Sequence, residues 1–582
     1  MSVRLSTTAA LLALSLAVGC SRERTPAGES AGMAPQLKIE QGVPEAIKAQ
    51  LAARPAFLGG DSEGDRVLKA VRAFYEKRDY APAWIDGRRP TKQLDALLDA
   101  LGAAEQEGLD PAVYGTQALI AHRQNAGGKQ FSRDAFPVDD IDDVEVWSTW
   151  AFMSYVSDLA DGVTDLSQIS KTWGMRPKPV DAAKVLNEAL ADGNVEKAIA
   201  DAAPQHPEYA ALRKALADHR RIATWGGWPK VPADIKLKEG AEHDAVPVLR
   251  KRLAMTHDYK GNADDPSRVY DKALVDAVKL FQLRHGLAED GVVAGRTLAA
   301  MNVPVAERVR QIELNMERWR WLPRDLGENH ARVNIPEYRL DLWEGDNIAL
   351  AMRVVVGTPA NKTPVFADQM TYIVFSPYWN VPPSIASEET LPAVQSDPGY
   401  LGRNNLEVVG TSGSVIDPSS VDWSNPDSYR FRQKPGTRNS LGLVKFMFPN
   451  QHNVYLHDTP ADALFARPAR AFSHGCVRVE QPTKLARYLL RDEKQWTEER
   501  IDAAMHAGRE QHVKLPKPIP VYLLYMTARA SHADGAVHFR EDVYGHDAQQ
   551  GRAFEQRMAR LQQRSAMMLD ALSPGSDAAG AR

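Results

Sequence analysis

Apolar residues recur with a helical period over the first part of the chain. Between residues 65 and 221 they are spaced three or four positions apart, as at Val67, Leu68 and Val71, and this spacing is typical of amphipathic helices. Proline residues separate the helical stretches. No group of side chains in this region has the spacing of a catalytic or metal site. We therefore predict a helical scaffold domain over residues 61–235.

A second, shorter helical pattern follows the turn at residues 225–229. Apolar positions predict two short helices, and a glycine-rich turn with an N-cap threonine precedes a third. The motif consists of Phe281-Gln282, then Asp290-Gly291, then Thr297-Leu298. This pattern resembles the peptidoglycan-binding domain found beside many cell-wall enzymes, and we expect such a domain over residues 240–305. A helical spacer that binds nothing is the alternative.

After residue 328 the apolar period changes to two, which predicts strands. Ala331, Val333 and Ile335 alternate with polar residues. Similar patterns cover residues 349–356, 370–375, 443–448, 454–456, 521–526 and 537–539. We therefore expect a mainly β domain over residues 328–545. A stretch rich in Pro, Gly and Ser at about residues 387–440 lacks periodicity, and because such long loops are usually functional, we expect an inserted lid.

The N-terminus has the pattern of a targeting segment, with Arg4 followed by an apolar run. The sequence that ends at Cys20 resembles a bacterial lipobox, in which the cysteine is lipidated and becomes the first mature residue. By the same resemblance, Ser21 directs sorting to the outer membrane. Residues 1–20 would then be a lipoprotein signal peptide and residues 21–60 a flexible tether. An ordinary signal peptide that contains a cysteine is the alternative.

Composition adds two constraints to this multidomain α+β architecture. The chain has 582 residues, which is too long for a single core, and residues 546–582 resemble a basic amphipathic helix with a disordered tail. The formal net charge of -4 gives no electrostatic footprint for a nucleic-acid partner. We therefore expect no binding to nucleic acid.

The chain contains two cysteines, Cys20 and Cys476. Exported proteins normally use cysteines in pairs as disulfides, so lipidation of Cys20 leaves Cys476 without a partner. A lone thiol in an oxidising compartment is more easily explained by chemistry than by packing. A buried, unreactive cysteine is the alternative.

The candidate chemistry lies in two neighbouring runs of the sequence. These are Tyr455-Leu456-His457-Asp458 and Ser473-His474-Gly475-Cys476. A cysteine attacks a carbonyl as the thiolate, so His457 is a candidate base that takes the proton of Cys476 and forms a thiolate–imidazolium pair. The N–H groups of Gly475 and Cys476 are candidate donors to an oxyanion. The carbonyl or the carboxylate of Asp458 is placed to hold the other imidazole nitrogen.

Together, the two runs resemble the active-site signature of the YkuD-type L,D-transpeptidases. The order of helical scaffold, peptidoglycan-binding domain and β catalytic domain with a lid resembles the large Gram-negative branch of that family. The resemblance implies that Cys476 is the nucleophile and His457 the general base. It also implies that His474 and Gly475, supported by Ser473, build the oxyanion turn, and that Tyr455 lines the pocket.

Three further residues are candidates for substrate contact. The commoner form of the motif has Asn two places after the cysteine, whereas this chain has Arg478. Arg478 is therefore a candidate partner for a substrate carboxylate. Trp379 and Asn380 are the other two candidates, and bracing the domain is the alternative role for both.

The resemblance implies a ping-pong reaction without a cofactor or metal. Cys476 would attack the carbonyl before the terminal D-Ala of a tetrapeptide stem, and an amine of a neighbouring stem would resolve the thioester, crosslinking two diaminopimelate residues. Water, a lipoprotein lysine or a free D-amino acid are alternative acceptors. The implied partners are peptidoglycan stem peptides, a membrane reached through lipidated Cys20, and other cell-wall enzymes. The implied location is the periplasm, at the outer membrane.

Three other interpretations are considered. His457, His474 and Cys476 could be zinc ligands, although the chain lacks a HExxH-type helix. The protein could instead be a cysteine peptidase, an L,D-carboxypeptidase or another hydrolase of peptidoglycan. It could also be a wall-binding lipoprotein without catalytic activity.

Overall fold

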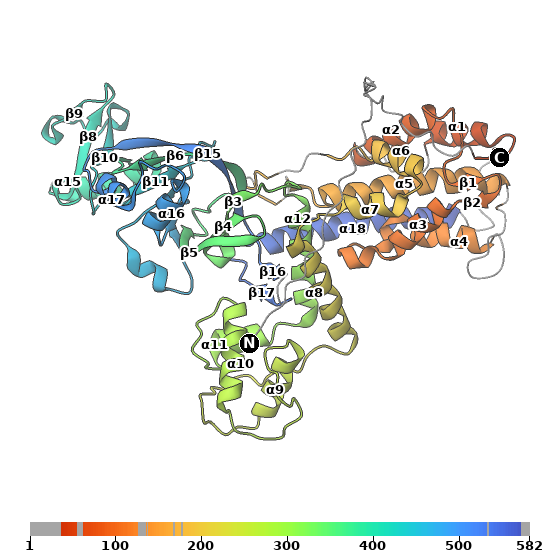
Figure 1. The fold of residues 1–582 in the computed structure, drawn as a ribbon, viewed down its shortest axis with the longest axis horizontal. Helices are drawn as coiled ribbons and strands as arrows, with labels where there is room; N and C mark the ends of the chain where they lie inside the picture. The colour runs from red at the N-terminus through yellow and green to blue at the C-terminus, as the bar shows by residue number, and fades with distance from the viewer. Residues whose placement is uncertain are drawn as a thin grey trace, which may run out of the picture.

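Three lobes surround a central helix in the computed structural model of the protein (Figure 1). The structure describes residues 37–54, 62–125, 136, 138–166, 169–170, 172–175, 179–397, 399–531 and 535–571. A helical lobe lies at one end and a β lobe at the other, and a small helical lobe lies beneath the junction. This order of a helical region, a small helical domain and a β-rich domain confirms the predicted fold class.

The helical lobe is built around one long apolar helix, α5 (Ile141–Asp161), which is buried on most of its circumference. Its other helices are α2 (Ser62–Glu76), α3 (Lys92–Gly102), α4 (Thr116–Asn125), α6 (Ala182–Asp192), α7 (Val195–Ala202) and α8 (Pro207–Thr224), with a short hairpin of β1 (Ile85–Asp86) and β2 (Arg89–Pro90). The carboxylate of Glu145, on α5, accepts hydrogen bonds from the backbone N–H groups of residues 83–85. This buried acid therefore fixes the hairpin on the central helix.

Two segments outside the predicted scaffold boundaries complete this lobe. Helix α1 (Val43–Ala53) lies within the expected tether, but it packs on α5 through Val43, Ile47 and Leu51. At the other end of the chain, α18 (His546–Ala571) packs beside α4 and α12. The expectation of a tether is therefore wrong for the residues of α1, because their apolar spacing of four positions gives the helix a face to bury.

The small lobe contains α9 (Val246–Met255), α10 (Lys272–Arg284) and α11 (Gly295–Met301) around a core of its own. The side chain of Gln282 donates to Asp290 Oδ1 at 2.8 Å and to Thr297 Oγ1 at 3.1 Å. Its own oxygen accepts from the N–H of Gly291 at 2.9 Å. Gln282 therefore connects the turn at Asp290-Gly291 to Thr297 of α11, so the predicted motif residues bond to one another.

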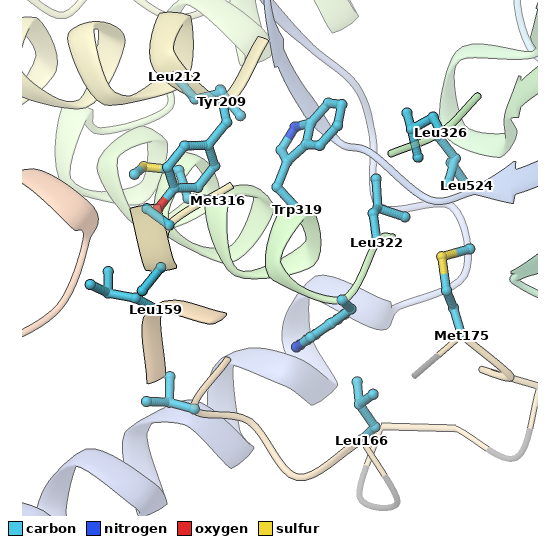
Figure 2. Packing of buried hydrophobic residues seen from close by; sticks show 14 of the residues in the cluster. Leu159, Leu166, Met175, Tyr209, Leu212, Met316, Trp319, Leu322, Leu326 and Leu524 are labelled. Atoms are coloured by element: carbon cyan, nitrogen blue, oxygen red, sulfur yellow. The ribbon is translucent and has the colours of Figure 1, made fainter. Parts of the chain in front are cut away.

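Helix α12 (Val305–Arg320) joins the three lobes. Figure 2 shows Trp319 of this helix between Tyr209 of the helical lobe and Leu524 of the β lobe, and Met316 beside Tyr209. One continuous apolar core runs through this junction, so the helical and β lobes share a single core. Glu317, which is fully buried, pairs with Arg320 at 2.8 Å and accepts from the N–H groups of residues 163 and 164.

The β lobe is a mixed sheet whose strand order closes on itself. Its strands are β3 (Asn329–Asn334), β4 (Arg339–Glu344), β5 (Asn347–Gly357), β6 (Phe366–Phe375), β11 (Val444–Met447), β12 (Leu456–His457), β13 (Ala471–Ser473), β14 (Val477–Val479) and β15 (Gln511–Leu524). The order is β13-β5-β14-β12-β11-β6-β15-β3-β4, and β4 also pairs with β5. Helices α16 (Pro482–Leu489) and α17 (Glu498–Met505) precede β15, and the hairpin of β16 (Ala528–Ala530) and β17 (Val537–Phe539) follows it.

The expected lid is a folded subdomain rather than an irregular loop. It lies between β6 and β11 and has a separate four-stranded sheet of β7 (Trp379–Asn380), β10 (Tyr429–Gln433), β8 (Leu406–Gly410) and β9 (Val415–Ile416). It also contains α13 (Pro383–Ile385), a π-helical turn (Ala386–Thr390), α14 (Leu391–Ser396) and α15 (Tyr400–Arg403). Apolar side chains, including Val408 and Phe431, give it a core of its own. We keep the name lid for residues 379–433.

Candidate active site

The parallel pairing of β12 with β14 brings the two predicted sequence runs together. Leu456 pairs with Val477 and His457 pairs with Arg478. Because side chains alternate across a strand, Leu456 and Val477 both point into the core. Tyr455, His457, Cys476 and Arg478 therefore share the opposite face of this ladder.

His457 is held in one tautomer by the backbone of the next residue. Its Nδ1 donates to the carbonyl oxygen of Asp458 at 2.5 Å, so Nε2 is the nitrogen that can accept a proton. The side chain is 4% exposed. Burial, and then the charge of Arg478, lower the pKa of His457 to about 3. The imidazole is therefore neutral at physiological pH.

Cys476 is a free thiol between β13 and β14. Burial raises its pKa, although the backbone and side chain of Tyr455 and the charge of Arg478 oppose the shift. Its Sγ also lies 3.9 Å from the carbonyl oxygen of Asn453. Since burial disfavours the charge on both Cys476 and His457, the resting pair is neutral. The thiolate–imidazolium pair expected from the sequence is not favoured at rest.

Hydrogen bonds of the Ser473 hydroxyl fix the backbone of the turn that leads to Cys476. The hydroxyl of Ser473 donates to the carbonyl of Cys476 at 2.6 Å and accepts from the N–H of Gly475 at 3.1 Å. Gly475 has a φ of 116°, which L side chains rarely adopt. Its N–H is therefore engaged within the turn, whereas that of Cys476 has no hydrogen-bond partner among the described residues. The Cys476 N–H is the donor that remains for an oxyanion.

A residue near the C-terminus supports this turn from behind. The carbonyl of Gly475 accepts from Thr363 Oγ1 at 2.8 Å. The hydroxyl of Tyr544 accepts from the N–H of Thr363 at 3.2 Å and donates to the carbonyl of Gly357 at 2.6 Å. Neither Thr363 nor Tyr544 was predicted, because both lie far from the motif in sequence.

The carboxylate of Asp458 has a structural role separate from that of its carbonyl. It accepts from the N–H groups of Leu443 at 2.8 Å and Thr459 at 2.7 Å. At Gly442, whose φ is 60°, a Cβ would lie 2.3 Å from Asp458 Cγ. Of the two predicted ligands for the imidazole nitrogen, the structure therefore selects the carbonyl.

Two cationic groups flank His457 on the same face. Arg478 is opposite it on β14, and Lys445 is opposite it on β11. Burial lowers the pKa of both groups. Arg478 Nε has no hydrogen-bond partner among the residues that the structure describes. Lys445 was not predicted from the sequence, although its place in a strand beside the one that carries His457 is a usable signal.

His474 contacts the lid rather than the other site residues. Its Nε2 lies 2.8 Å from Glu389 Oε1, on the π-helical turn of the lid. The two side chains are 45% and 54% exposed. Glu389 was not predicted, because nothing in the motif indicates which lid residue reaches the catalytic turn.

The remaining predicted residues lie elsewhere or outside the described residues. Trp379 and Asn380 form β7, where they pair with Gln433 and Arg432 of the lid, and Trp379 packs against the lid core. Their contact with substrate stays a prediction. Cys20 lies outside the described residues.

Two kinds of feature were not found in the described residues. No three His, Cys, Asp or Glu side chains of this part of the chain form a group that could hold a metal ion. None of its helices is both long enough and apolar enough to pass through a bilayer.

Three family models match successive segments of the chain. The model described as "Scaffold domain" matches residues 69–216, and the one described as "Putative peptidoglycan binding domain" matches residues 242–301. The YkuD model, described as "L,D-transpeptidase catalytic domain", matches residues 328–500. The last segment contains both runs of site residues.

A relative and two solved structures were also found. The Haemophilus influenzae protein named "Putative L,D-transpeptidase" is 37% identical over 283 residues, which cover 47% of this chain and 57% of that protein. An L,D-transpeptidase structure from Xylanimonas cellulosilytica is 15% identical and covers 50% of this chain and 99% of its own, with a TM-score of 0.16. A fused Zn-dependent amidase/peptidase/peptidoglycan-binding protein from Clostridium acetobutylicum is 12% identical with the same coverage and a TM-score of 0.15. Neither TM-score carries an argument about the fold.

The matches follow the order predicted from the apolar patterns, and the family signature lies on one face of the β12–β14 ladder. The catalytic segment of the chain, residues 328–500, belongs to the YkuD family of L,D-transpeptidases, and a scaffold domain and a peptidoglycan-binding domain match the segments before it.

Proposed function

We propose that this protein is a cysteine-dependent L,D-transpeptidase that crosslinks diaminopimelate residues of peptidoglycan tetrapeptide stems. One observation carries the proposal. His457 keeps Nε2 free as a proton acceptor, because its Nδ1 donates to the Asp458 carbonyl, on the same ladder face as Cys476. A neutral thiol beside a neutral, oriented imidazole is a nucleophile with its base.

The first half of the reaction forms a thioester and releases D-Ala. Cys476 Sγ attacks the carbonyl carbon before the terminal D-Ala as its proton passes to His457 Nε2. The oxyanion accepts a hydrogen bond from the N–H of Cys476. As the tetrahedral intermediate collapses, the C–N bond breaks, and the imidazolium returns the proton to the leaving amine. The base thus starts and ends the step neutral, in keeping with its low pKa.

The second half transfers the acyl group to an amine of a neighbouring stem. The amine attacks the thioester carbonyl, His457 takes its proton, and the C–S bond breaks to restore the Cys476 thiol. Water as acceptor would make the same site an L,D-carboxypeptidase. We favour the amine because the family match is to a transpeptidase domain.

The flanking cations suit a substrate that bears carboxylates. Arg478 Nε has no partner in the described part of the chain, and Arg478 lies opposite His457, so we assign it to a carboxylate of the stem peptide. Lys445 adds a second positive charge on the same face. Peptidoglycan is the proposed partner, and a periplasmic position with a lipid anchor at Cys20 and contacts with other cell-wall enzymes remains part of this proposal.

Replacement of the nucleophile tests the proposal. Purified wild-type protein incubated with disaccharide-tetrapeptide is expected to release D-Ala and to form crosslinked dimers, measured by mass spectrometry. Cys476→Ala should lower the rate of both by roughly 10⁴-fold or more, because it removes the thiol that forms the proposed thioester. Cys476→Ser should also be inactive, since a hydroxyl is a far weaker nucleophile beside a neutral base.

Ser412→Ala, in an exposed turn of the lid, is the control and should keep full activity. Dimer formation by Cys476→Ala at the wild-type rate would refute the assignment. Tripeptide as the only product of the wild type would instead establish the carboxypeptidase.

A further inference from the structure

The turn that links α8 to the small lobe carries two tryptophans with different surroundings. Trp228 donates from its indole N–H to the carbonyl of Val303 at 3.0 Å, and the guanidinium of Arg252 lies 4.0 Å from its ring centroid. Trp225 is 71% exposed, more than any other large apolar side chain in the described part of the chain. Trp228 therefore fastens the turn, whereas Trp225 presents an aromatic ring to solvent.

The ring of Trp225 lines a cavity of about 680 Å³, which shares His285, Arg308 and Phe539 with a neighbouring cavity of about 1090 Å³. The cavity beside Trp225 lies between the end of α8, the small lobe and β17. Its walls include Ile222, Trp225, Met255, Lys260, Leu280 and Val537. A cavity at a domain boundary with apolar walls and a few polar groups has the usual character and size of a ligand site.

The charged groups that face this cavity are mostly cationic. Arg252 and Arg308 line it, and neither has a carboxylate within ion-pair distance among the described residues; each bonds to carbonyl or other neutral oxygens instead. Lys260 adds a further positive charge. Asp218, at the cavity edge, is already paired with Arg221 at 2.6 Å. A ligand with a carboxylate would therefore complement these walls.

An exposed aromatic ring with cationic side chains around it is better suited to bind a sugar than to bind an apolar protein surface. The C–H groups on one face of a pyranose ring carry partial positive charge, and they are attracted to the negative face of an indole ring. A protein partner would require a broader contiguous apolar patch than one tryptophan beside the partly exposed Leu280. Residues 217–241 also lie between the segments that match the scaffold and peptidoglycan-binding families.

We propose that Trp225 and this cavity form a binding site for the glycan strand of peptidoglycan. A sugar ring stacks on Trp225, and the lactyl carboxylates of sugars that carry no stem peptide face the arginines. The inference rests on the proposed function, because it takes peptidoglycan as the polymer. The site lies on the scaffold and small lobes, away from Cys476, so it holds the polymer without taking part in the chemistry.

Binding to purified glycan tests this proposal. Peptidoglycan strands stripped of their peptides by an amidase are titrated into the full-length protein, and the dissociation constant is measured from the quenching of tryptophan fluorescence. Trp225→Ala should raise the dissociation constant about tenfold, which matches the usual strength of an aromatic contact. Trp225→Phe, which keeps a ring, should recover most of the affinity. Val415→Ala, at a residue 57% exposed in the lid, is the control and should bind normally.

Crosslinking of soluble disaccharide-tetrapeptide is measured on the same variants. Trp225→Ala should leave it unchanged, so failure of the glycan site and failure of the transpeptidase proposal give different results. Equal glycan affinity of wild type and Trp225→Ala would overturn the inference. Binding of the wild type to intact sacculi but not to peptide-free glycan would overturn it as well, because the protein would then recognise the peptides.

Discussion

The surroundings of His457 keep its imidazole unprotonated. Burial and the neighbouring charge of Arg478 bring its pKa to about 3, below the ordinary value of 6.5. A base is active in its neutral form, so its protonation removes activity only near or below pH 3. The hydrogen bond from Nδ1 to Asp458 fixes the tautomer throughout this range. In the proposed mechanism, the proton therefore moves from Cys476 to His457 during the attack on the carbonyl rather than from a preformed ion pair.

We expect the pH profile of kcat/KM to show no inflection near pH 6.5. Activity on disaccharide-tetrapeptide should stay level from about pH 8 to about pH 5, as far as His457 determines it. The ¹³C shift of its ring, identified by loss of the signal in His457→Gln, should not titrate in this range. A shift with a midpoint near 6.5 would contradict the neutral-base mechanism.

The lowered pKa of His457 also makes the stability of the folded protein depend on pH. The unfolded chain binds a proton at His457 below about pH 6.5, whereas the folded chain does not until about pH 3. The unfolded state therefore binds more protons between these values. The contribution of His457 makes the protein less stable as pH falls from about 6.5 toward 3.

At the residue level, the sequence motif predicted the residues that share one face of the β12–β14 ladder, but not the side chains that support them. Cys476 and His457 could be found because the family signature contains both. Thr363 could not be found, because its role depends on a buried hydroxyl that reaches a turn 112 residues later. Lys445 was missed although it lies in a predicted strand, because its pairing with His457 had to be added to that prediction. The role of Gly475 also differs from the predicted oxyanion donor, because its N–H donates to the Ser473 hydroxyl within the turn.

Among the elements, the lid makes a direct contact with the catalytic turn. The pair of Glu389 and His474 joins its π-helical turn to the residue two positions before Cys476. Both side chains are about half exposed, so solvent screens the pair and its contribution is at most about 1 kcal/mol. Such an energy is enough to bias a lid between open and closed positions by up to roughly fivefold.

Glu389→Gln should therefore loosen the lid without unfolding it. Amide hydrogen exchange over β8 and β10 is expected to rise by up to roughly fivefold, because the charged contact with His474 is lost. Glu388→Gln changes the neighbouring exposed residue and is the matched control, with exchange as in the wild type. Equal exchange rates in the two variants would show that the contact does not hold the lid.

The lid fold could not be predicted because its elements are too short for periodicity to appear. Two of its four strands have two residues each, and its core depends on aromatic contacts between segments. Strands such as β6 were predictable, since ten residues provide several alternations.

For the whole molecule, the shared core determines how the protein unfolds. The helical and β lobes belong to one apolar cluster that runs through α12, whereas the small lobe and the lid each have a separate cluster. The two large lobes should therefore lose structure together. The two small units can open independently.

Glu317→Gln tests this cooperativity. Glu317 is fully buried with Arg320, so loss of its charge removes the ion-pair partner of a buried guanidinium and should destabilise the protein by about 3 kcal/mol. Denaturant midpoints are measured from far-UV circular dichroism and from the reactivity of the Cys476 thiol, and both should fall together. Glu313→Gln, one turn earlier on α12 and partly exposed, should cost about 1 kcal/mol or less. A fall in one midpoint but not the other would contradict the shared core.

The order of the domains could be predicted from the sequence, but the completion of the helical lobe could not. Helices α1 and α18 come from opposite ends of the described chain and pack into the same lobe. Periodicity predicts that a helix has an apolar face, but it does not say which distant surface covers that face.

The hydrogen bonds of Tyr544 that support the catalytic turn can form only late in the synthesis of the chain. Tyr544 and α18 are among the last described residues to be synthesised, and the hydroxyl of Tyr544 bonds to the backbone that carries Thr363 and, through it, Gly475. A chain still in production holds Cys476 in a turn without this support. In the proposed mechanism, the turn that carries Cys476 therefore gains this support only after Tyr544 has been synthesised and packed, and a chain that stops before residue 544 should carry a less firmly positioned thiol.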